Sequence, residues 1–168
     1  YEDCAEITGI DKLTTEQINA AAGMGYRIKL LGVAENNNGR YSLFVAPCLV
    51  GEDTLFAATG GVFNAVSVTG NMVGEVVFYG QGAGRYPTAY NVVEDLVDVL
   101  AGKGSYAPYG EKVAADNSCT LRYYVRGGWQ GETEERWGDA VVTAPVAVGE
   151  IHVWLKENPD AFIAAIKE

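Results

Sequence analysis

A glycine-rich segment, residues 79–89 (YGQGAGRYPTA), lies between a run with β-strand alternation and a run with helical periodicity. Glycine allows positive φ and a close approach of the backbone to a ligand. The start of a helix presents unpaired N–H groups and the positive end of its dipole. The segment therefore predicts a strand–loop–helix unit that suits an anionic or carboxamide-bearing ligand, such as a nucleotide cofactor. Because the same spacing occurs in plain turns, a purely structural loop stays open on this evidence alone.

The composition indicates a globular protein, with 48% hydrophobic and 20% charged residues in 168 positions. This length allows one medium domain, or one domain with a small appendage. The net charge of −10 disfavours nucleic acid and anionic lipid, which both attract clustered Lys and Arg. The longest apolar run, residues 43–50, is too short to span a bilayer. We therefore expect no nucleic-acid partner and no membrane partner.

The three cysteines, Cys4, Cys48 and Cys119, are widely spaced. This spacing fits neither a disulfide framework nor a cluster of metal ligands. The run of Glu132, Glu134 and Glu135 indicates a solvated face. We expect reduced thiols in a cytoplasmic protein and no metal site.

Turn and cap signals divide the first hundred residues. Thr14 and Gln17 have the spacing of a capping box, and the helix that follows should end at Gly23. Asn36 to Gly39 predicts a hairpin turn. The alternation of apolar residues predicts strands over 27–35, 40–47, 62–69 and 72–79, with a loop and one helical turn over 51–61. A helix should start at Thr88 and continue to residue 100, with its apolar stripe packed in the core.

The remaining residues predict a small tail. We expect a strand over 120–126, a helical turn over 132–137, a strand over 140–146, a helix over 149–158 and a last strand over 161–166. Trp129, Trp137 and Trp154 should form the core of this tail, and His152 is interpreted as a structural or surface histidine. Asn64, a polar residue inside a β-patterned run, is interpreted as structural.

Several separated motifs resemble one family. Residues 61–70 (GVFNAVSVTG), 73–84 (VGEVVFYGQGAG), 87–89 (PTA) and 95–96 (DL) resemble the C-terminal half of the catalytic domain of homoserine dehydrogenases. Residues 7–10, 25–31 and 45–49 resemble earlier parts of that family in the same order. The resemblance covers about residues 6 to 100. It predicts three divisions: residues 1–105 as catalytic-domain part, 106–118 as linker and 119–168 as a small tail similar to an ACT domain.

The family resemblance implies an NAD(P)-dependent oxidoreductase that interconverts L-homoserine and L-aspartate 4-semialdehyde by hydride transfer. It further implies a role in threonine and methionine biosynthesis, a cytoplasmic location and a homodimer built through the catalytic-domain sheet. The family's dinucleotide-binding domain and catalytic lysine lie upstream of the matched part, so we assign no catalytic residue here. By resemblance, Gly82, Ala83, Gly84 and Thr88 approach the nicotinamide end of the cofactor.

We expect an α+β fold in which helices pack on one face of a mostly antiparallel sheet of about four strands. Because the chain starts at Tyr1 without a leader, we expect that an upstream part is missing and that the chain alone is inactive. The alternative is a non-enzymatic module that dimerises through its sheet or binds a regulatory amino acid.

Overall fold

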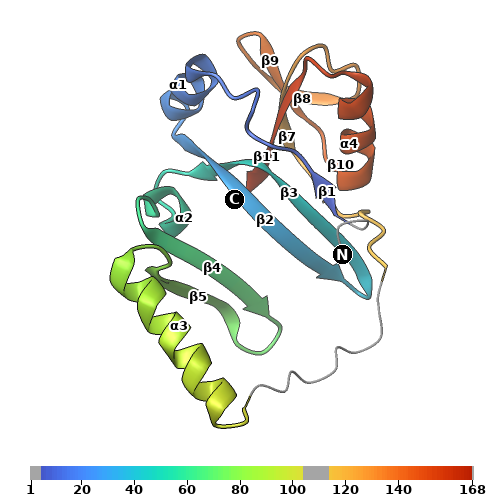
Figure 1. Cartoon of the computed structure of the whole chain (residues 1–168). Coiled ribbons are helices and arrows are strands. Elements are labelled where there is room, and N and C mark those ends of the chain that lie inside the picture. Colours follow the sequence, from blue (N-terminus) through green and yellow to red (C-terminus); the bar gives the residue numbers. More distant parts are fainter. Residues whose placement is uncertain (1–4, 104–113, 168) are drawn as a thin grey trace. The chain divides into compact units, whose positions relative to one another are not determined.

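The computed structural model describes residues 5–103 and 114–167 (Figure 1). Two compact units divide the chain: residues 1–57 with 113–168 form the first, and residues 58–112 form the second. The α+β class predicted from the sequence is confirmed. Most of the predicted linker, residues 106–113, lies outside the described residues.

A seven-stranded sheet is the framework of the first unit, with the order β1-β3-β11-β7-β9-β8 and with β2 also paired to β3. Its strands are β1 (Glu6–Ile7), β2 (Tyr26–Asn37), β3 (Arg40–Gly51), β7 (Tyr123–Arg126), β8 (Thr133–Trp137), β9 (Ala140–Thr143) and β11 (Phe162–Lys167). Four of the pairings are antiparallel, while β1 and β11 run parallel to β3. A separate antiparallel pair joins β6 (Thr120–Leu121) and β10 (Val146–Ala147).

Local signals in the sequence explain where these elements start and end. The hairpin between β2 and β3 turns at Asn38 and Gly39, which have φ of 54° and 86°. Asn and Gly tolerate this left-handed region, as the sequence predicted. Helix α1 (Thr15–Gly23) begins with the expected capping box between Thr14 and Gln17.

Hydrophobic side chains are buried on both faces of the large sheet. On β3 the side chains of Phe44, Ala46 and Cys48 belong to one core, while Leu49 belongs to the other. This alternation follows from the two-residue period of a strand. Helix α4 (Val148–Glu157) packs on the first core and α1 on the second. The helices therefore cover both faces, and the expectation of helices on one face was wrong.

The tail differs from its prediction in two respects. Residues 133–137 form strand β8 rather than a helical turn, because they pair with β9. Strand β11 lies between β3 and β7, so that β7, β8, β9 and β11 share one sheet with β1 to β3 instead of folding separately. The division predicted at residues 105 and 119 therefore does not coincide with the compact units.

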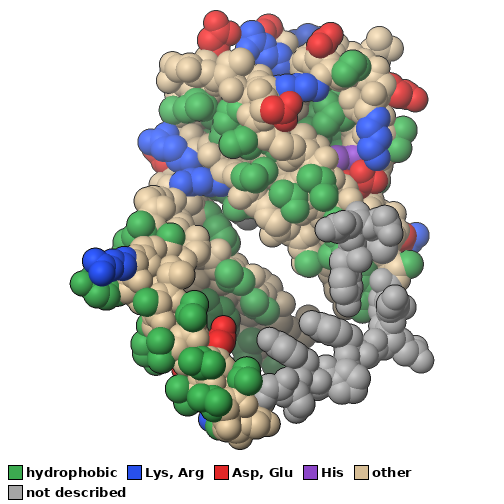
Figure 2. All heavy atoms as spheres, in the orientation of Figure 1, with side chains coloured by type: hydrophobic (Ala, Val, Ile, Leu, Met, Phe, Trp, Pro, Cys, Tyr) green, Lys and Arg blue, Asp and Glu red, His purple; other side chains and the backbone are tan. Residues whose placement is uncertain are grey.

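The second unit consists of a hairpin and one helix. Strands β4 (Phe63–Gly70) and β5 (Gly74–Gln81) form a separate antiparallel sheet, so the predicted four-stranded sheet does not form. Helix α3 (Arg85–Leu100) has no buried side chain. The prediction that its apolar stripe packs in the core was wrong, because Val93 and Leu96 are 58% and 57% exposed. Figure 2 shows hydrophobic side chains on the surface of this helix.

Helix α2 (Leu55–Ala58) is the single helical turn that was expected between residues 51 and 61. Among the helices that the structure describes, none has the length and apolar character required to cross a membrane.

Candidate functional site

The glycine loop connects the last residue of β5 with the first turn of α3 in the second unit. Two of its N–H groups are already used, because those of Gly82 and Ala83 both donate to the carbonyl oxygen of Val62, at 3.0 and 3.3 Å. These bonds extend the hairpin ladder by one step and hold the start of the loop against the beginning of β4. The loop is therefore a fixed turn at its N-terminal side.

Gly84 has the backbone conformation that most clearly requires glycine. Its φ and ψ are 123° and 156°, a region that residues with a Cβ rarely adopt. It is also the N-cap of α3, and it has no side chain to cap the helix. The first N–H groups of α3 are thus left for an external acceptor.

Helix α3 begins at Arg85, three residues before the predicted start at Thr88. Pro87 lies inside the first turn, where a missing N–H removes no helical hydrogen bond. The N–H of Thr88 donates to the carbonyl oxygen of Gly84 at 3.2 Å, while its side chain is exposed. Within residues 5–103 and 114–167, the N–H groups of Arg85 and Tyr86 have no hydrogen-bond acceptor.

This end of α3 suits an anionic ligand for two reasons. The two unpaired N–H groups lie at the positive end of the helix dipole. The guanidinium of Arg85, with its carbon 5.8 Å from the centre of the Tyr86 ring, adds a positive charge at the same helix end. Gly82, Ala83, Gly84 and Thr88, the residues predicted to contact the cofactor, all lie in this loop and first turn. Arg85 and Tyr86 were not predicted, because the proline was taken as the boundary of the helix.

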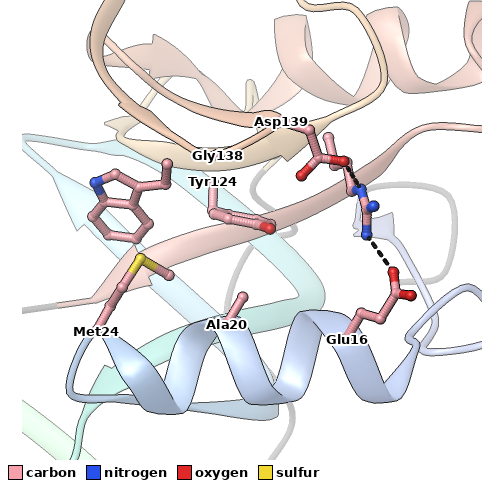
Figure 3. Close-up of a pocket in the computed structure, with 8 residues that line it drawn as sticks. Glu16, Ala20, Met24, Tyr124, Gly138 and Asp139 are labelled. Atoms are coloured by element: carbon pink, nitrogen blue, oxygen red, sulfur yellow. Dashed lines mark hydrogen bonds and ion pairs between the residues drawn. The ribbon is translucent and has the colours of Figure 1, made fainter.

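A pocket of about 470 Å³ lies in the first unit, between α1, the strands β7 and β8 and the turn that follows β8 (Figure 3). Ala20 of α1 and Met24, the C-cap of this helix, lie on the side of the pocket opposite Tyr124, and Trp137 also lines the pocket. The centres of the two aromatic rings are 6.1 Å apart. One side of the pocket is therefore apolar and aromatic.

Three charged side chains form the other side of this pocket. Arg126 binds Asp139 through Nε at 2.6 Å and Glu16 through Nη1 at 3.5 Å. The hydrogen bond to Asp139 raises the pKa of Arg126. The guanidinium of Arg126 is already paired with these two carboxylates, so the pocket offers no unpaired cation. The sequence did not predict this site, since its residues come from distant positions and no motif joins them.

His152, the single histidine of the sequence, has a structural role as interpreted above. It is 2% exposed, and its Nδ1 lies 2.7 Å from the carbonyl oxygen of Val148. Burial lowers its pKa, although the hydrogen bond to Val148 acts in the opposite direction.

The cysteines that the structure describes are free thiols, Cys48 buried and Cys119 half-buried. Burial raises the pKa of the Cys48 thiol to about 12, and burial also raises that of Cys119. Thiols that stay protonated are poor nucleophiles and poor metal ligands. Among the described residues, no group of His, Cys, Asp or Glu is arranged to hold a metal ion.

Comparison with known proteins identifies relatives for much of this chain. The model of the family described as homoserine dehydrogenase matches residues 2–97. The homoserine dehydrogenase of Pseudomonas aeruginosa is 50% identical over 98 residues, which are 58% of this chain and 23% of that protein. That of Synechocystis is 39% identical over 124 residues, which are 70% of this chain and 28% of that protein.

Comparison with solved structures identifies members of the same family. The crystal structure of a homoserine dehydrogenase from Thiobacillus denitrificans matches all of this chain and 48% of its own, with a TM-score of 0.73 and 26% identity. The homoserine dehydrogenase of S. aureus at pH 6.0 has a TM-score of 0.65 at 23% identity, over 100% of this chain and 48% of its own, which shows likeness of fold alone. The chain thus spans about a quarter of the curated relatives and about half of the solved chains.

Proposed function

This chain belongs to the homoserine dehydrogenase family, and we propose that it is part of an NAD(P)-dependent enzyme that interconverts L-homoserine and L-aspartate 4-semialdehyde. In this proposal the enzyme acts in threonine and methionine biosynthesis in the cytoplasm. The catalytic lysine and the dinucleotide-binding domain lie in a part of the enzyme outside this chain. The observation that carries the proposal is the strand–glycine loop–helix unit with Gly84 in a conformation that favours glycine.

The loop residues fit one end of a nicotinamide coenzyme. At Gly84 the backbone is exposed and has no Cβ, so a flat ring can approach the main chain closely. The N–H groups of Arg85 and Tyr86 and the hydroxyl of Thr88 provide hydrogen-bonding groups at the N-terminus of α3. When bound, the coenzyme would supply or accept the hydride, and these residues would hold its position.

Positioning is the contribution that this chain would make to the reaction. A displacement of ~1 Å in a reacting group can reduce a rate by roughly 100-fold. The loop is anchored on both sides, by the bonds of Gly82 and Ala83 to Val62 and by the bond of Thr88 to Gly84. A loop held in this way limits the movement of whatever binds to it.

We also propose a homodimer, because the second unit exposes apolar side chains on its hairpin. Val66 and Phe78 are paired across β4 and β5 and are 57% and 64% exposed. Exposed apolar surface of this kind favours association. A second copy of the chain is the partner that the family resemblance implies.

The test is an assay of the complete polypeptide that contains this chain, with L-homoserine and either NAD or NADP. We expect reduction of the coenzyme by the complete enzyme and none by residues 1–168 alone. Gly84→Val should raise the KM for the coenzyme at least several-fold in a folded enzyme. A complete polypeptide that fails to oxidise homoserine with either coenzyme would contradict the proposal.

The pocket beside α1 favours a second candidate, a non-enzymatic module that binds a small amino acid. Its apolar side would contact the side chain of a small amino acid, and the carboxylate of this ligand would replace Glu16 or Asp139 on Arg126. Calorimetric titration with threonine separates the two candidates. Heat of threonine binding to the wild type that disappears in Arg126→Ala would support the binding module. The absence of heat with the wild type would exclude threonine binding and reject this candidate.

A further inference from the structure

Asn64 and the glycine loop are neighbours on one face of the hairpin in the second unit. Asn64 of β4 is directly opposite Gly80 of β5 in the antiparallel register. Because side chains alternate between faces along a strand, residue 82 is on the same face as residue 80 and lies diagonally from Asn64. The side chain of Asn64 is thus placed beside the first loop glycine.

The Asn64 side chain fills the space that a side chain at position 82 would need. A Cβ built on Gly82 would overlap the Asn64 amide nitrogen and would lie 2.7 Å from its Cγ. It would lie 3.5 Å from the Cβ of Asn64, which is an ordinary contact distance. The conflict therefore involves the amide group of Asn64 and not its Cβ.

Position 80 provides the internal comparison. A Cβ built on Gly80 meets no atom within 4 Å, although Gly80 is directly opposite Asn64. Neither Gly80 nor Gly82 has the positive φ that makes Gly84 unsuitable for other residues. Backbone strain therefore does not explain Gly82, and the steric conflict there is with the amide end of the exposed Asn64 side chain.

We infer that Asn64 is a positioning residue that packs against Gly82 and thereby holds the Gly82–Gly84 loop in the conformation that receives the coenzyme. The contact of Asn64 with the loop is the packing of its amide group beside Gly82. This inference rests on the proposed function, since the coenzyme is its readout.

The test uses a double-mutant cycle in the complete enzyme, with Gly82→Ala, Asn64→Ala and both together, and Gly80→Ala as matched control. Gly82→Ala should raise the KM for the coenzyme about threefold, because the new methyl displaces the amide end of the exposed Asn64 side chain from the loop. Asn64→Ala should raise it about threefold through a looser loop. The double variant should resemble Asn64→Ala, because the overlapping amide is gone.

The KM for homoserine separates positioning from general damage, and it should change less than twofold in all four variants if the loop acts on the coenzyme alone. The inference would be overturned if the two single effects on the KM for the coenzyme multiplied in the double variant. It would also be overturned if Gly82→Ala and Gly80→Ala had the same KM. An inactive wild-type enzyme would instead reject the proposed function. Thermal unfolding of the same variants would then test the steric conflict, because Gly82→Ala should be less stable than the double variant, in which the Asn64 amide is absent.

Discussion

The two units of this chain place similar apolar patterns in opposite environments. In the first unit, β3, β7 and β11 have buried side chains on both faces, and α1 and α4 cover these faces. In the second unit, the apolar stripe of α3 and the Val66 face of the hairpin are exposed. A periodic apolar pattern thus indicates which side of an element avoids water, but it does not say whether this chain itself provides the cover.

The largest expected difference between the units is in the cost of removing an apolar side chain. Ile163 of β11 is 0% exposed, so Ile163→Ala should lower the free energy of unfolding by about 2–5 kcal/mol. Leu96→Ala in α3 should change it by less than about 0.5 kcal/mol, because the side chain is already in water. Urea unfolding measures both. Equal costs would mean that α3 is covered in solution.

Association should depend on the exposed face of the hairpin. Phe78→Asp introduces a charge on the proposed dimer surface and should raise the dissociation constant of the dimer at least tenfold, or about 1.4 kcal/mol. Thr69→Asp, on the opposite face of the same hairpin, is the control and should leave it unchanged. Analytical ultracentrifugation over a concentration series measures the constant. A monomeric wild type at tens of micromolar would contradict the dimer.

The dry core of the first unit should make its stability depend on pH through His152. Burial lowers the pKa of this histidine in the folded state below its usual value of 6.5. At a pH between the pKa of His152 in the folded chain and its pKa in the unfolded chain, the unfolded chain binds a proton that the folded chain does not. The free energy of unfolding should therefore fall as the pH decreases below about 6.5.

The control for this effect is His152→Leu, which removes the titrating group. The urea midpoint of the wild type should decrease between pH 7 and pH 5.5, and the decrease should be smaller in the variant. An identical pH dependence in both proteins would assign it to other groups.

The smallest expected effect concerns the cap of α1. Thr14→Ala removes the side-chain acceptor for the Gln17 N–H and should cost about 1 kcal/mol. Thr14→Ser keeps the hydroxyl and should be close to the wild type. Thermal unfolding compares them, and an unaffected Thr14→Ala protein would show that packing of the buried residues Gln17 and Ala21, and not the cap, holds the helix.

Much of the secondary structure was predictable because its signals are local. The capping box at Thr14, the turn at Asn38 and Gly39 and the strands on both sides of it depend on neighbours within a few residues. Residues 133–137 were missed because their strand exists through its pairing with β9, which a local pattern does not contain. The start of α3 was misplaced because Pro87 is tolerated in a first turn.

The glycine loop was located from the sequence, but the reason for each glycine was not. Gly84 is explained by its φ of 123°. At Gly82 a Cβ would meet the amide of Asn64, a residue eighteen positions earlier that had been interpreted as structural. The pocket beside α1 had no sequence signal, because Glu16, Arg126 and Asp139 meet only after the sheet has formed.

Most helices, strands and turns could be predicted from the residues alone, because caps, turns and periodicity act between near neighbours. The residues alone also indicated the family and the position of the glycine loop. The insertion of β11 between β3 and β7, the two buried faces and the exposed stripe of α3 depend on contacts between distant residues. Burial is a property of what an element packs against, and an amphipathic pattern carries no record of that partner.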